Sequence, residues 1–310
     1  MNTQDQRIAA HNNWPTKEEF KAERAFREHL KAKGDNPPFK TTALSQGNDR
    51  TYQMCVGHFV DGLEALPYRP DYFFDHCFKV IDASAKPLFN KQGIKGIVQG
   101  LGGKLLSASL QDWQATVDAL GSHIPLMTCR YVAKRMLLVH GSADDLDKQL
   151  EARVEKCMHK AVYDEFVKKF GTDASGAKLN PPTDSAIEKA ASFLKLYLSG
   201  TPASMSRGSG FARLNLKDPK NVPTHHQRIE FFLSILLFTM RNERSHGGVL
   251  SPFRTSKGTL ERYESYYFAM LCAYVFSLGA LSLRGFGSVS GRSIANCTTA
   301  NVALQKAFFS

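Results

Sequence analysis

The segment from Tyr266 to Leu283 constrains the fold most, because it runs 18 residues without a charged side chain between Glu264 and Arg284. A helix of that composition must be shielded from water, either by a bilayer or by other protein segments. Its length is at the lower limit of about 18 residues for a membrane span, and it contains several tyrosine and serine residues. We therefore expect a helix buried on all sides, in a bundle or a dimer interface, and no membrane association.

The rest of the chain is also helical in pattern. No stretch sustains the two-residue alternation that is typical of a half-buried strand, and Asn-Gly hairpin signals are absent. The sequence therefore predicts an all-α fold. Capping residues and apolar periodicity predict helices over residues 17–34, 49–66, 72–83, 109–120, 126–139, 146–170, 186–198, 228–243, 260–283 and 293–308.

Two stretches rich in glycine or proline mark expected breaks. Gly93–Gly103 is expected to form turns and no phosphate-binding loop, because Val98 and Leu105 stand where such a loop requires Gly and Ser or Thr. Residues 171–182 combine Gly, Ser and Asn with two prolines and predict a linker. We therefore expect a helical N-terminal region over residues 1–180 and a second domain over residues 181–310.

The chain is basic, with 40 Lys and Arg against 29 Asp and Glu and a net charge of +11. The excess is concentrated between Thr201 and Lys257, where nine basic residues face three acidic ones. A basic surface favours a polyanionic partner such as nucleic acid. The six scattered cysteines include no CxxC pair, and the first twenty residues are too polar for a signal peptide. We therefore expect free thiols and a cytoplasmic location.

The string Arg241-Asn242-Glu243-Arg244-Ser245-His246 closes the predicted helix over residues 228–243. The apolar run over residues 231–238 precedes it and provides a rigid mount, and Gly247-Gly248 follows it. Glycine tolerates the left-handed conformation that ends many helices, so His246 can fold back toward Arg241. A permanent cation, an amide and a titratable imidazole therefore meet at one helix end, where they can hold a phosphodiester and move a proton.

Four other arginines are followed by a histidine at a similar spacing, so the context must discriminate among them. Two of these pairs lie in charged helices, where a solvated face is expected, and one spans Pro70 and an aromatic run. The pair Arg135…His140 also ends a helix, but the residues between its ends are apolar and suit a buried wall. Whether it supplies a second half-site within the same chain stays open. The four pairs are Arg24…His29, Arg69…His76, Arg135…His140 and Arg153…His159.

The R-N-x-x-x-H string, the helix that carries it and the long apolar helix that follows resemble the HEPN superfamily of all-helical ribonucleases and toxins. The resemblance covers the region from Thr183 to Ser310, with its specific part at one helix end. It implies a HEPN-like helical bundle in which two copies of the motif face each other across a homodimer. It also implies metal-independent cleavage of RNA, with Arg241, Asn242 and His246 as catalytic residues.

The chemistry follows from the residue types. RNA carries its own nucleophile, the 2′-hydroxyl, and an imidazole can remove its proton or protonate the leaving oxygen. A guanidinium can neutralise the charge that builds up on the phosphate. Basic residues around the motif are expected to bind RNA, and no metal ion or other cofactor is expected. These residues are Arg244, Arg228, Arg254 and Lys257.

Such enzymes are often toxins or effectors of bacterial antiphage or toxin–antitoxin systems, so a neutralising antitoxin or a trigger protein is a further expected partner. Two alternatives stay open. The first is a non-catalytic HEPN-like module that binds RNA or nucleotides through the same basic surface. The second is a structural or partner-binding helical protein, in which the basic surface meets an acidic antitoxin. The motif would then be only a capped helix end, where a cation is favourable against the helix dipole.

Overall fold

The computed structural model describes residues 2–89, 93–202, 210–247 and 249–310. The predicted all-α fold is confirmed: within these ranges the chain forms helices and no strand, and only an isolated bridge joins Thr172 to Lys178. Gly248, Arg207 and the other residues at 203–209, which the sequence places in a basic loop, lie outside the described residues.

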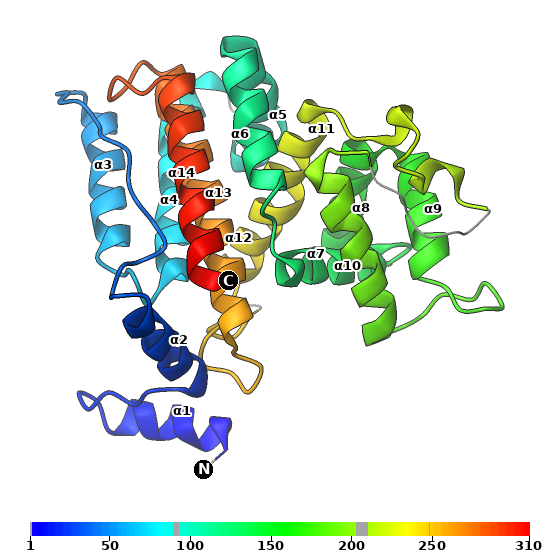
Figure 1. Cartoon of the computed structure of the whole chain (residues 1–310), viewed down its shortest axis with the longest axis horizontal. Coiled ribbons are helices and arrows are strands. Elements are labelled where there is room, and N and C mark those ends of the chain that lie inside the picture. The colour runs from blue at the N-terminus through cyan, green and yellow to red at the C-terminus, as the bar shows by residue number, and fades with distance from the viewer. Residues whose placement is uncertain (1, 90–92, 203–209, 248) are drawn as a thin grey trace.

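Helix α13 (Leu260–Leu283) lies at the centre of the molecule (Figure 1). It packs against α4 (Pro70–Ala85), α14 (Gly291–Phe309), α5 (Gly93–Ala108) and α7 (Leu126–Val139). Every residue from Tyr267 to Leu281 is buried. Among the described helices it is the one long and apolar enough to cross a membrane, but other helices already cover its apolar surface. The neighbouring helices therefore provide the shielding from water that the apolar composition of α13 requires.

Most predicted helices form close to their predicted bounds. Helix α7 and helix α13 match the predicted residues, and Asp49 caps α3 as an aspartate is expected to, accepting a hydrogen bond from the backbone N–H of Tyr52 at 2.9 Å. The other helices of this group are α4, α14, α2 (Lys21–Ala32), α3 (Arg50–Leu63), α6 (Leu110–Gly121) and α10 (Asp184–Ser199). An unpredicted helix, α1 (Thr3–Asn12), precedes them.

Two local predictions were wrong. Residues 93–108 form one continuous helix, α5, because its glycines let neighbours approach closely: a Cβ at Gly102 would lie 2.4 Å from the Ile229 side chain. The predicted helix over residues 146–170 is instead two helices, α8 (Asp145–Met158) and α9 (Lys160–Phe170). The break is at His159, whose φ of 64° is incompatible with a right-handed helix.

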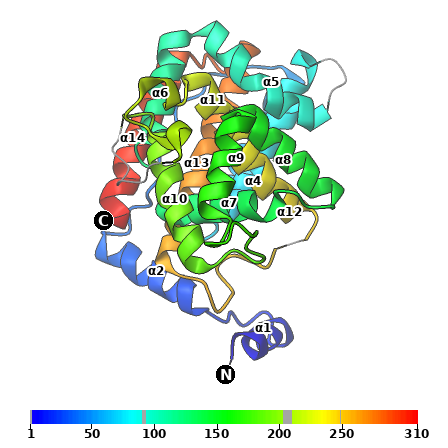
Figure 2. The same ribbon diagram turned by 90° about the vertical axis from the view of Figure 1, so that its right-hand side faces the viewer.

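The expected boundary near residue 180 does not separate two cores. Helices from both sides of it share one continuous cluster of buried apolar residues. Helix α10 packs beside α7 and α9 (Figure 2), and α13 and α14 pack on α4 and α6 respectively. The helices before and after residue 180 are therefore interleaved, and each group completes the other's core.

Candidate functional site

The candidate site lies at the end of a long helical segment from His225 to Ser245. It begins as α11 (His225–Glu230), where Thr224 and Gln227 form a reciprocal capping box. It passes through a π-helix, η4 (Phe231–Leu237), and ends as α12 (Phe238–Ser245). All residues of η4 are buried, as the apolar sequence requires. The π-helix is a rare conformation that is frequent at functional sites.

The helix ends at the predicted residues. His246 is the C-cap, its backbone N–H donating to the Asn242 carbonyl at 3.0 Å, and Gly247 follows with φ of 68°. The Arg241 guanidinium donates to Asn242 Oδ1 at 3.1 Å. Arg241 and Asn242 are half-buried, whereas His246 is exposed. Asn242 therefore positions the cation, and the imidazole at the helix end is open to solvent.

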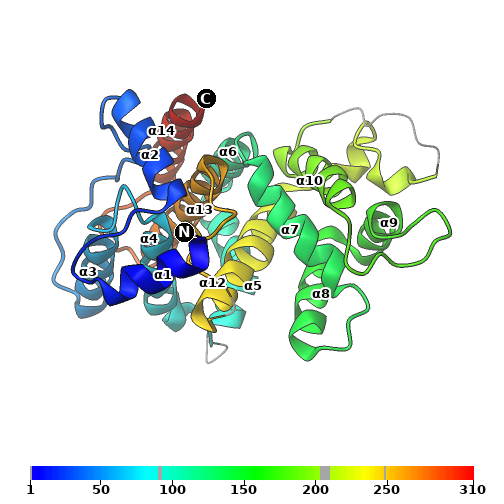
Figure 3. The same ribbon diagram turned by 90° about the horizontal axis from the view of Figure 1, so that it is seen from below.

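Two residues within the motif fix this helix end between other helices. Glu243 accepts a hydrogen bond from the Tyr131 hydroxyl at 2.9 Å and pairs with the Arg135 guanidinium at 3.0 Å, and both partners lie on α7. Figure 3 shows α12 lying between α4 on one side and α7 with α8 on the other. Burial and the neighbouring Glu243 carboxylate raise the pKa of Tyr131 well above its usual value, so its hydroxyl stays a donor.

Arg244 fixes the other side of the same helix end. Its guanidinium reaches Asp75 at 2.6 Å and Asp71 at 3.2 Å, both on α4. Burial alone would lower the pKa of Arg244, but hydrogen bonding to Asp75 and the charges of Asp75 and Asp71 raise it. Glu243 and Arg244 are therefore anchoring residues, although by sequence they fill the variable positions of the motif.

The surroundings of the five Arg…His pairs differ in the structure. Arg24 pairs with Glu19, Arg69 with Asp71, and Arg135 with Glu243 and Asp147, while Arg153 is buried beside Thr239 and Phe238. In the described part of the chain no acidic side chain pairs with Arg241, and the His246 imidazole makes no protein hydrogen bond. Arg241…His246 is thus the pair whose cation and imidazole both stay available to a ligand.

Arg135 and His140 do not form a second half-site in the contacts of this chain. Arg135 is neutralised by two carboxylates, and the His140 imidazole bonds Glu151 of α8 at 2.8 Å. His140 also packs edge-on against Tyr163. Both side chains therefore connect α7 to its neighbours. If the site needs a second Arg…His motif, this pair does not supply it.

The four residues predicted to bind RNA have different surroundings. Arg228 is buried and bonds Asp118 at 2.6 Å, and Arg244 is paired with carboxylates of α4. The prediction that these two residues bind RNA is therefore corrected: both stabilise the fold. Arg254 pairs with Glu23 at 2.8 Å but stays half-exposed, and Lys257 is exposed. Only Arg254 and Lys257 therefore keep a surface suited to phosphate contacts.

The structure also brings together three potential metal ligands that the sequence analysis did not single out: His58, Asp61 and His76. His58 and Asp61 are spaced one helical turn apart, but that spacing is common. The third member comes from another helix, so no local motif signals the group.

Comparisons with known proteins add no relative: the chain matches no protein-family model, no curated protein and no solved structure. The HEPN resemblance therefore rests on the helix end and on the apolar helix that follows it.

Proposed function

We propose that the chain is a metal-independent endoribonuclease that cleaves RNA through attack of the 2′-hydroxyl on the adjacent phosphate. The observation that carries the proposal is the Arg241 guanidinium, which has no acidic partner among the described residues and lies beside Asn242, five residues before an exposed His246. Arg241 binds the phosphate and offsets its growing negative charge. His246 transfers a proton at the attacking or the leaving oxygen. The products are a 2′,3′-cyclic phosphate and a 5′-hydroxyl.

A homodimer completes the site in this proposal, because one chain supplies one histidine of the motif and the reaction uses both an acid and a base. Large apolar side chains directly beyond the motif support the dimer: Val249 and Leu250 are 39% and 62% exposed. Exposed apolar side chains next to a polar site are typical of an interface. We propose a second copy of this chain as the occupant, with the two motifs facing each other.

The wider role follows from the resemblance alone. We propose a cytoplasmic toxin or effector of antiphage defence or of a toxin–antitoxin pair, with the basic Arg254 and Lys257 contacting RNA or an acidic antitoxin. The interleaved N-terminal helices would then transmit a trigger to α12 through Asp71 and Asp75 of α4, which bond Arg244.

The test compares wild type with His246→Ala and Arg241→Ala on total RNA in EDTA, followed by mapping of the cleaved ends. We expect each variant to cut at least about 100-fold more slowly. His226→Ala, which removes an exposed histidine from α11, is the matched control and should cut like wild type. A synthetic RNA with one 2′-deoxy position at the cleavage site should resist cutting there.

Two results would count against the proposal. Cleavage that leaves a 5′-phosphate, or equal cleavage of the 2′-deoxy substrate, would exclude 2′-hydroxyl attack. RNA that is bound but left intact by every variant, with affinity lowered by Arg241→Ala and not by His246→Ala, would instead indicate a non-catalytic RNA-binding module. Melting curves with and without EDTA show whether the chelator affects folding.

A further inference from the structure

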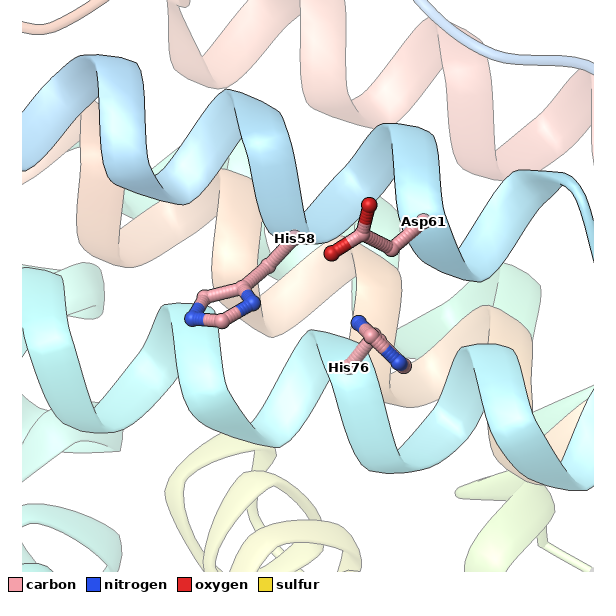
Figure 4. A group of neighbouring side chains, drawn as sticks. All are labelled: His58, Asp61 and His76. Carbon is pink, nitrogen blue, oxygen red and sulfur yellow. The ribbon is translucent and has the colours of Figure 1, made fainter.

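His58, Asp61 and His76 converge between helices α3 and α4. One ligand atom from each of the three side chains lies within 4.8 Å of the other two. Figure 4 shows His58 and Asp61 projecting from α3, and the His76 ring entering the same space from α4. The rings of the two histidines are 5.7 Å apart between centroids. The three side chains therefore surround one point.

The convergence depends on a close approach of the two helices. His58 and Asp61 are three residues apart, so they share one face of α3. The next residue, Gly62, is buried against α4: a Cβ there would lie 2.5 Å from the Phe73 ring and 3.0 Å from the His76 Cβ. Because Gly62 has no side chain, α4 comes close enough to bring His76 within reach of Asp61.

Both imidazoles have free coordinating capacity. The Nδ1 atoms of His58 and His76 are buried and have no hydrogen-bond partner among the described protein atoms. A neutral imidazole with a free ring nitrogen is the form that binds a metal. Asp61 contributes a carboxylate, and its side chain is exposed.

We propose that His58, Asp61 and His76 bind a divalent transition metal of the zinc class. Two imidazoles and a carboxylate form a ligand set typical of zinc, whereas magnesium and calcium prefer oxygen ligands alone. A tetrahedral ion with bonds near 2.1 Å would place the donors about 3.4 Å from one another, and they now lie within 4.8 Å. Three protein ligands leave a fourth position for water. Lys79 is the nearby cation that opposes binding, and it is exposed on α4.

The ion would fasten α3 to the rest of the molecule. Among the described helices, α3 makes its extensive contact with α4 alone. A metal shared between the two helices therefore stabilises the native position of α3, because an ion that binds only the folded chain raises its stability with concentration. This inference does not rest on the proposed ribonuclease, and its readout is metal binding rather than RNA cleavage.

The experiment uses the full chain, expressed without a histidine tag and stripped of metal with a chelator that is then removed. Calorimetric titration with Zn²⁺ should show one tight equivalent. Co²⁺ should give the visible absorption of a four-coordinate site. Zn²⁺ should also raise the melting temperature of the wild type.

Three variants test the ligands: Asp61→Asn, His58→Ala and His76→Ala. Each should weaken Zn²⁺ binding by roughly 100-fold or more, since losing even an outer-shell partner costs 10- to 100-fold. Asp61→Asn is the decisive variant, because the side chain is exposed and the change leaves the fold intact. Glu64→Gln, at the end of the same helix, and His226→Ala, an exposed histidine on α11, are matched controls and should bind like wild type.

The outcomes are separable. One Zn²⁺ equivalent in wild type and controls, lost in Asp61→Asn and His58→Ala, supports the site. No binding to wild type overturns it. Binding that survives in all three variants also overturns it and places the ion elsewhere, for example on a cysteine.

Discussion

Arg241 and Arg244 are three residues apart on α12, but they have different roles because their neighbours differ. Arg244 bonds Asp75 and Asp71 and is 11% exposed. Arg241 is bonded only to the neutral Asn242 amide among the described side chains. An arginine that is already neutralised contributes to stability, whereas one without an acidic partner can bind an anion at little cost to the fold.

Removing the two guanidiniums should separate these tasks. We expect Arg244→Ala to lower the free energy of unfolding by about 3 kcal/mol, because Asp71 and Asp75 lose a partner in a largely buried ion pair. Arg241→Ala should change it by less than about 0.5 kcal/mol, as for most substitutions away from the core. Urea denaturation of both variants measures the difference. Equal losses would mean that Arg241 is also a structural residue.

Glu230 is a buried carboxyl at the start of η4, with 3% exposure and no hydrogen-bond partner for either oxygen among described residues. Burial raises its pKa from 4.5 to about 7. Between pH 4.5 and about pH 7, the folded chain therefore keeps a proton on Glu230 that the unfolded chain has already released. By linkage, this group lowers stability progressively as pH rises from about 4.5 to about 7, and the loss is complete above that.

Glu230→Gln removes this ionisation without changing the shape of the side chain. We expect it to raise the free energy of unfolding at pH 8 by up to about 3 kcal/mol, and to have little effect at pH 4. Glu28→Gln, an exposed carboxylate on α2, should have no such pH dependence. A gain from Glu230→Gln that is equal at both pH values would show that its carboxyl is not the titrating group.

At the scale of helices, the close approach of α3 and α4 can be tested by a single substitution at Gly62. Gly62→Ala places a methyl group against Phe73 and should lower the free energy of unfolding by about 1–3 kcal/mol through overpacking. It should also weaken Zn²⁺ binding, because the ligands on the two helices move apart. Gly57→Ala on the same helix meets no atom within 4 Å and should be neutral or slightly stabilising. Calorimetric melting and Zn²⁺ titration of both variants measure the two effects.

The sequence predicted the helices whose ends are set by local chemistry. Helix α13 was predictable because no charged residue interrupts it from Tyr266 to Leu283, and α7 because Pro125 and Gly141 flank it. The break at His159 was not, because neither glycine nor proline marks it. It forms where α8 and α9 each bury an apolar face, as tertiary packing overrides local preference.

The candidate site was predictable only in part. The helix end, its left-handed Gly247 and the position of His246 follow from local sequence. The bonds from Arg244 to Asp75 and from Arg228 to Asp118 join residues more than 100 positions apart, and so does the contact of Tyr131 with Glu243. No local pattern encodes such pairs. From the sequence alone, arginines that form ion pairs in the folded chain could not be distinguished from arginines that are free to bind RNA.

For the molecule as a whole, the proposed homodimer makes a prediction about its surface. Leu250→Asp should convert a dimer into a monomer in analytical ultracentrifugation and abolish RNA cleavage, because a charged side chain in an apolar contact is costly to desolvate. Leu146→Asp, at an exposed leucine on α8, is the matched control and should stay dimeric and active. An active Leu250→Asp monomer would refute the shared site.

The central place of α13 also has a consequence for synthesis of the protein. Helices α4, α5 and α7 are made more than 100 residues before α13, yet each has part of its apolar face covered by it. A ribosome must therefore release residues up to 283 before the earlier helices can complete their packing, and until then exposed apolar surface invites chaperone binding. If the chain cuts RNA as we propose, it would gain that activity only after most of its own message has been translated.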